Sequence, residues 1–175
     1  GMIWAYEVLG WGGYWGWDPV ENTSLIPWLT ATALLHSFTL YRRRGIFKRW
    51  AVSLAMATFW LTIVATWTTR TGLINSVHAF EHNKVLIIVL SSLLVAVLSG
   101  GAVLLGRSWQ AFSAEGELES LLSRDFFYYA ANVALSLFAG AVLFATVVVP
   151  LVLGQTVRPR TYEALAQPLG VLTVL

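Results

Sequence analysis

The histidines are the side chains in this sequence with the clearest capacity for chemistry, because neutral imidazole both binds metals and transfers protons. The chain has 3 of them: His36 in an apolar stretch, and His78 and His82 in a polar one. If residues 78–82 were helical, His78 and His82 would share a face and could hold zinc. Such a pair arises easily by chance, so a single histidine in an aqueous loop is the simpler interpretation.

His36 lies deep inside the apolar stretch that begins near Ser24. An ionisable side chain at membrane depth indicates a functional site by default. Neutral imidazole is a common axial ligand of haem, and the core of a helical bundle is a usual place for haem. The alternative is a neutral histidine that hydrogen-bonds to a neighbouring helix or extends toward Arg42. The sequence leaves both interpretations open.

A tryptophan-rich stretch runs from Trp11 to Trp28 and holds 4 of the 9 tryptophans, among glycines and directly before an apolar segment. Tryptophan has a flat apolar ring with one N–H donor. The stretch therefore predicts either an aromatic belt at a membrane surface or a platform for a flat apolar ligand.

The polar residues after the tryptophans have structural explanations of their own. Asp18 and Pro19 are typical of a turn, and Asn22 or Thr23 would cap the helix that follows. Further along, Arg70 begins the polar stretch that contains His78. Its guanidinium could pair with a carboxylate such as a haem propionate, or it could anchor a helix end at the membrane surface.

Composition decides the class of protein. The 175 residues are 57% hydrophobic and 11% charged, whereas soluble domains carry about 25% charged residues. Apolar segments recur along the whole chain, so a signal peptide alone does not explain them. The chain has no cysteine, which excludes a disulfide, a thiolate nucleophile and a Cys-bound metal. No pattern indicates nucleic acid as a partner, and membrane lipid is the expected surrounding.

Membrane-spanning helices should position these residues. Such a helix needs about 20 mostly apolar residues. The segments that qualify are about 24–41, 50–69, 85–105 and 126–153. We predict an all-α integral membrane bundle with four transmembrane helices at 24–153, as part of a larger polytopic protein. Residues 1–24 would hold the end of a truncated helix and the tryptophan stretch. Residues 154–175 would begin a region outside the membrane.

The basic residues predict the orientation. Of the 11 Lys and Arg, 5 lie within residues 42–49, so this loop should be cytoplasmic, and residues 106–125 with it. The loop at 70–84 and the tryptophan stretch then face outward. His78 and the tryptophans should therefore share one side of the membrane, where a loop histidine could reach a flat ligand on the rings.

Taken together, these residues resemble the haem-handling WWD-domain family, whose motif is WGxxWxWD. Trp11, Gly12, Trp15, Trp17 and Asp18 fit the motif in register. The continuation through residues 19–22, with Pro27 and Trp28, resembles CcmF-type cytochrome c haem lyases. Further matches lie at 34–37, 70–72 and 76–80, with looser ones at 123–124 and Asn132. The NrfE-type paralogue fits equally well.

The resemblance implies two haem sites. The tryptophan stretch would hold a substrate haem at the outer face, and His78 would bind its iron. His36 would bind the iron of a separate b-type haem that passes an electron outward. The residues implied in binding haem are His78, His36, Trp11, Trp15, Trp17, Asp18, Asn22 and Arg70.

The implied activity is cytochrome c biogenesis in the bacterial cytoplasmic (inner) membrane. The enzyme would join haem through thioether bonds to the CxxCH cysteines of apocytochrome c. The haem chaperone CcmE would deliver haem, and a CcmH-type subunit would present the apocytochrome. The alternative is a haem transporter, exporter or delivery protein of the same family that forms no bond.

The sequence departs from the family in two respects. Tyr14 stands where many members have another tryptophan. The family's other outer histidine, expected upstream, and its other membrane histidine, expected downstream, are absent. Each haem therefore has one candidate axial ligand here, and we expect this segment alone not to bind either haem through two histidines.

Overall fold

A computed structural model describes residues 15–113 and 123–174, and every regular element in these ranges is a helix. Trp11, the predicted helix end before it and most of the acidic part of the 106–125 loop lie outside the described residues. The elements are α2 (Pro19–Arg44), α3 (Lys48–Thr71), α4 (Lys84–Ser108), the 3-10 turn η1 (Trp109–Phe112), α5 (Arg124–Leu143), the π-helical turn η2 (Phe144–Val148), α6 (Val149–Leu153) and α7 (Pro159–Val174).

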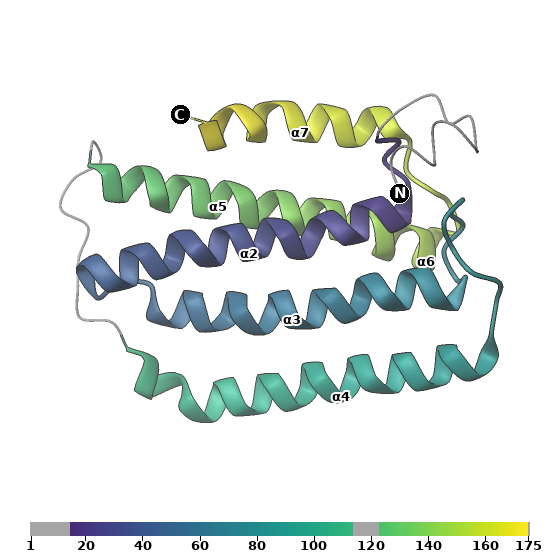
Figure 1. Cartoon of the computed structure of the whole chain (residues 1–175), viewed down its shortest axis with the longest axis horizontal. Coiled ribbons are helices and arrows are strands. Elements are labelled where there is room, and N and C mark those ends of the chain that lie inside the picture. The colour runs from purple at the N-terminus through teal and green to yellow at the C-terminus, as the bar shows by residue number, and fades with distance from the viewer. Residues whose placement is uncertain (1–14, 114–122, 175) are drawn as a thin grey trace.

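The long helices lie side by side in the order α7, α5, α2, α3, α4 (Figure 1). The central helix α2 packs against α5 on one side and α3 on the other, and α4 and α7 are at the two edges. The buried apolar core follows this order, with Ile26, Leu29 and Ala33 of α2 between Leu54 and Leu61 of α3 and the buried face of α5. The all-α membrane bundle predicted from the sequence is confirmed.

Three of the described helical segments are long and apolar enough to cross a membrane: Lys48–Thr71, Lys84–Phe112 and Arg124–Leu153. The sequence predicted a fourth in the region of α2. This helix has 26 residues, about 39 Å of length, but is less apolar because its buried face carries Thr23, Thr30 and Ser37. These side chains meet protein on both sides, so α2 does not need the hydropathy of a lipid-facing helix.

A polar cluster joins the three central helices near the end opposite the start of α2. Asn132 of α5 donates its amide to the carbonyl oxygen of Ala33, at 2.8 Å, and to the hydroxyl of Ser37. The indole N–H of Trp50 in α3 donates to the Asn132 side-chain oxygen at 2.5 Å. Because leaving a buried polar atom without a partner is costly, this cluster fixes the register of α2, α3 and α5.

The start of α2 differs from the prediction. Asp18 caps the helix, and Glu21 completes a capping box with it, whereas Asn22 and Thr23 lie inside the first turns and are buried. Pro19 at the first helical position favours this earlier start. As a result of this early start, Pro27 lies in the helix interior.

The last long segment bends back on itself. After η2 and α6, the helix ends at Gly154, which has a left-handed backbone conformation. Residues 154–158 connect to α7, which returns along α5 (Figure 1). The region expected to begin outside the membrane thus contains a helix that packs on the bundle.

The loop between α3 and α4, residues 72–83, is called the His78 loop below. It leaves α3 at Gly72, whose φ of 62° favours glycine. A Cβ atom on Gly72 would lie 2.6 Å from the carbonyl oxygen of Phe80, and the Phe80 N–H donates to the Thr69 carbonyl at 2.9 Å. The loop therefore folds back tightly over the end of α3.

Replacing Gly72 with alanine should displace the His78 loop. Gly45→Ala is the matched control, because Gly45 has φ 71° but a Cβ atom there would have no neighbour within 4 Å. Both variants incur a left-handed strain of about 1–2 kcal/mol. Gly72→Ala should lose a further ~1–3 kcal/mol through overpacking. Thermal unfolding of the purified protein measures the difference, and equal midpoints for the two variants would contradict the close approach.

Candidate ligand-binding site at the start of α2

A pocket of about 710 Å³ lies where α2 begins, within the size range of small-molecule and cofactor sites. Its walls come from the start of α2, the His78 loop, the η2–α6 segment and the chain around α7's first turn. The lining residues are Gly16, Trp17, Asp18, Pro19, Glu21, Asn75, Ser76, Val77, His78, Thr146, Pro150, Thr156, Val157, Pro159 and Tyr162.

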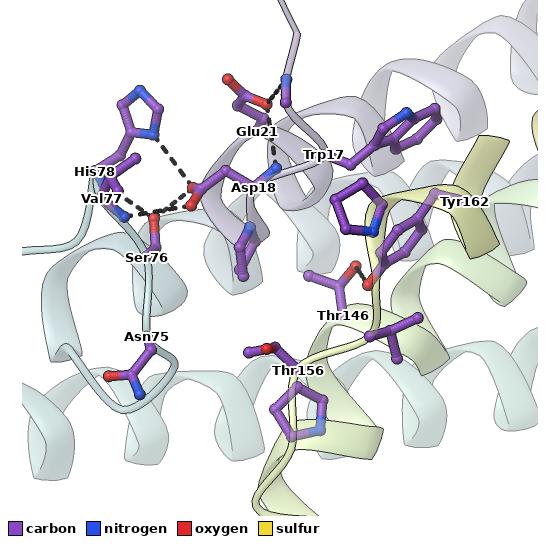
Figure 2. Close-up of a pocket in the computed structure, with 15 residues that line it drawn as sticks. Trp17, Asp18, Glu21, Asn75, Ser76, Val77, His78, Thr146, Thr156 and Tyr162 are labelled. Carbon is purple, nitrogen blue, oxygen red and sulfur yellow. Dashed lines mark hydrogen bonds and ion pairs between the residues drawn. The ribbon is translucent and has the colours of Figure 1, made fainter. Parts of the chain in front are cut away.

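Asp18 joins α2 to the His78 loop at this pocket (Figure 2). Its Oδ2 accepts from the Val20 N–H at 3.0 Å and from the Ser76 hydroxyl, and lies 3.2 Å from Nδ1 of His78. Its Oδ1 accepts from the Val77 N–H at 3.3 Å. One carboxylate therefore holds together two segments about 60 residues apart in sequence.

Glu21 fixes the backbone that leads into Asp18. Its Oε2 accepts from the N–H groups of Gly16 at 2.9 Å and Asp18 at 3.2 Å. Between them, Trp17 has a φ of 56°, which is uncommon for a residue with a side chain. This turn directs the Trp17 ring to one wall of the pocket and the Asp18 carboxylate to another (Figure 2).

Trp17 is held by aromatic contacts. Its ring stacks on Tyr162 of α7 with centroids 5.4 Å apart and planes 7° from parallel, and Trp15 meets it edge-on at 5.8 Å. Such pairs are typically worth about 0.5–1.5 kcal/mol beyond their buried area. Two flat rings, Trp17 and Tyr162, therefore line one side of the pocket.

A buried chain of hydrogen bonds also connects Trp17 to Tyr162. Asn22 is 0% exposed and donates its amide to the Trp17 carbonyl at 3.1 Å and to the Thr146 hydroxyl at 3.2 Å. Thr146 in turn donates to the Tyr162 hydroxyl at 3.1 Å. Asn22 does not line the pocket, so it positions Trp17 from behind.

Thr146 and Tyr162 are site residues that the sequence interpretation missed. Thr146 lies in the π-helical turn η2, a distortion often found at functional sites, and its hydroxyl in an apolar run was the available signal. Tyr162 carried no such signal. Its burial raises the pKa of the phenol, with a smaller opposing effect of the Thr146 hydrogen bond, so the hydroxyl stays neutral at physiological pH.

Arg70 and His82 do not line the pocket. Arg70 is exposed, with its guanidinium carbon 4.3 Å from the centroid of the Phe80 ring. Residues 78–82 are not helical, so the shared face that a His78–His82 zinc pair needs is absent. Among the described residues, no group of three or more His, Cys, Asp or Glu side chains could hold a metal ion.

His36 occupies a second, separate place. It lies eighteen residues after Asp18 on α2, about 27 Å along the axis. Its ring contacts Tyr128 of α5 at a centroid distance of 5.6 Å. Its Nδ1 atom is buried, with no hydrogen-bond partner in the described part of the chain. The described part of the neighbouring helices therefore does not supply the hydrogen bond to Nδ1 that the alternative interpretation of His36 expects.

Comparison with known proteins agrees with the resemblance. The model of the cytochrome C assembly protein family matches residues 1–74. The chain is 40% identical to the cytochrome c-type biogenesis protein CcmF of Pseudomonas fluorescens, over 100% of this chain and 27% of that protein. It is 50% identical to the NrfE biogenesis protein of Escherichia coli, over 63% of this chain and 20% of NrfE. A solved structure named cytochrome c heme lyase CcmF matches with a TM-score of 0.72 and 30% identity, covering 99% of this chain and 25% of that one.

The family model, the relatives and the solved structure together show that the chain belongs to the cytochrome c assembly proteins. Within the class, the relatives and the solved structure identify the chain as a CcmF-type segment. The chain spans about a quarter of the length of the CcmF proteins that it matches.

Proposed function

We propose that this segment holds substrate haem at the pocket beside Trp17, with Nε2 of His78 as a ligand of the haem iron. The observation that carries the proposal is the position of His78, which lines a pocket of about 710 Å³ with Trp17 and Tyr162. The residues fit the group, because imidazole is a common haem ligand and flat rings pack against a flat macrocycle.

The other residues have different roles in this proposal. Trp15 and Trp17 form the described part of the platform, which Trp11 would extend, and Asn22 holds Trp17 through its carbonyl oxygen. Arg70 lies at the end of α3, from which the His78 loop leaves, so its exposed guanidinium is a partner for a haem propionate. Its contact with Phe80 keeps it close to that loop.

The proposed reaction is the attachment of haem to apocytochrome c. Each thiol of a CxxCH motif adds across a haem vinyl group: sulfur bonds to one vinyl carbon, and the thiol hydrogen ends on the other. The addition needs no net oxidant or reductant. This chain has no cysteine, so both thiols come from the apocytochrome. The proposed partners are CcmE as the haem donor and a CcmH-type subunit that presents the apocytochrome.

His36 would hold a resident b-type haem in the membrane. Its imidazole fits that role, because its buried Nδ1 lacks a partner in the described residues and its ring lies between α2 and α5. A haem there would supply an electron that keeps the substrate haem reduced. In the proposed orientation, the loop at 42–49 is cytoplasmic and the pocket faces the periplasm, in the bacterial inner membrane.

The test separates a lyase from a haem transporter. The full-length protein is made with its assembly partners and an apocytochrome whose motif is either CxxCH or AxxAH. If the protein is a lyase, the CxxCH cytochrome keeps its haem after denaturation, and the AxxAH cytochrome has no such haem. A transporter binds haem at the pocket yet gives no denaturation-resistant haem with either substrate.

A further inference from the structure

We propose that Asp18 is a positioning residue for His78: its carboxylate holds the imidazole as the Nδ1–H tautomer, which leaves the lone pair on Nε2 for a haem iron. This inference rests on the proposed function, since it says how the proposed ligand is prepared. It also gives the aspartate of the tryptophan motif a role that needs no contact with haem.

The tautomer follows from the partners of the carboxylate. Its Oδ2 lies 3.2 Å from Nδ1 of His78 (Figure 2). An ionised carboxylate can only accept hydrogen bonds, so a ring nitrogen beside it must carry the proton. The other partners of Asp18 agree with this, because Val20 N–H, Val77 N–H and the Ser76 hydroxyl are all donors to it.

The same carboxylate also fixes the backbone that carries the ring. The Ser76 hydroxyl donates to Asp18 and accepts from the His78 N–H at 3.0 Å. The His78 imidazole and its backbone N–H are therefore tied to one group, the first directly and the second through Ser76. Asp18 itself cannot drift, because it caps α2 and its own N–H donates to Glu21 at 3.2 Å.

The result is a carboxylate–imidazole arrangement of the kind that orients histidine ligands of metals. Such a partner fixes the tautomer and ring orientation and raises the basicity of the ligand nitrogen. Loss of a partner of this kind typically weakens metal binding by about 10- to 100-fold. We expect a loss of haem affinity of this size when Asp18 can no longer reach His78.

Two replacements of Asp18 separate its roles. Asp18→Asn keeps an oxygen that caps α2 and can still accept from His78 Nδ1, but removes the charge. Asp18→Ser keeps a good helix cap, but its shorter side chain leaves Nδ1 without its acceptor. Ser123→Ala is the control, because it removes the cap of another helix, α5, without removing a contact of Asp18 or His78.

The measurement reads the tautomer directly. The full-length protein, free of haem and labelled with ¹⁵N at histidine, is placed in lipid bilayers, and ¹⁵N NMR reports which ring nitrogen of His78 carries the proton. A His78→Ala sample assigns the signal. We expect Nδ1–H in the wild type, in Asp18→Asn and in Ser123→Ala, and a shift toward Nε2–H in Asp18→Ser.

Titration of haemin into the same proteins gives the second readout. Asp18→Ser should bind about 10- to 100-fold more weakly, and Asp18→Asn should lose less than about tenfold. An Nε2–H signal in the wild type, or Nδ1–H and full haemin affinity in Asp18→Ser, overturns the inference. Full affinity in His78→Ala overturns the proposed ligand instead, so the two failures are distinguishable.

Discussion

Replacing His78 with alanine should remove the substrate haem and abolish holocytochrome formation, while the b-type haem remains. The imidazole lines the described pocket, and histidine is the commonest protein ligand of haem iron. The other candidate groups of the lining are engaged, since Asp18 and Glu21 accept from backbone N–H groups and the Tyr162 hydroxyl accepts from Thr146. The measurement is the haem spectrum of the full-length protein, with denaturation-resistant haem on the cytochrome as the activity readout.

His82→Ala is the matched control for this prediction. His82 lies in the same loop four residues on and is exposed, and it does not line the pocket. We expect wild-type spectra and activity for it. A His78→Ala protein that keeps its substrate haem, or a His82→Ala protein that loses it, would contradict the assignment of the ligand.

The sequence was sufficient to predict that the tryptophan stretch and the His78 loop lie near each other. Basic residues at 42–49 predicted that both lie at the same end of the bundle, and the structure brings Asp18 to 3.2 Å from His78. The contact itself was not predictable. It depends on the turn at Trp17 and on the close return of the loop over Gly72, and both are tertiary features.

The sequence contains a signal for the true start of α2, but the hydrophobic pattern favoured a later start. Asp18, Pro19 and Glu21 form a capping box with proline at the first helical position, which is a readable pattern. The hydrophobic pattern begins later, near Ser24. The predicted start of the helix followed this pattern and was therefore too late. Hydropathy also underestimates α2 as a membrane-spanning helix. Its polar residues Thr30 and Ser37 are buried against neighbouring helices, whereas a hydropathy scale assumes contact with lipid.

The far wall of the pocket could not be derived from the sequence. Tyr162 stacks on Trp17 across 145 positions, because the chain turns back after Gly154 so that α7 returns along α5. Neither the turn nor the return has a local periodicity that a single sequence displays. Trp11, the first tryptophan of the motif, stays a prediction, since it lies outside the described residues.

Replacing His36 with alanine should give the opposite spectral result: loss of the b-type haem with the substrate haem retained. His36 lies about 27 Å along the α2 axis from Asp18, the residue that His78 contacts, so a change at one histidine should not reach the other by contact. Holocytochrome formation should fall, because the electron that keeps the substrate haem reduced is lost. Absorbance spectra of the reduced protein measure both haems at once.

The control for His36 is Leu35→Ala, the adjacent residue on α2, which is 67% exposed. It changes the size of a side chain at the same depth without touching the proposed ligand, so both haems should remain. Added reductant should restore part of the activity of His36→Ala and none of that of His78→Ala. If His36→Ala and His78→Ala lose the same haem signal, the chain serves one haem, and the buried Nδ1 of His36 needs another explanation.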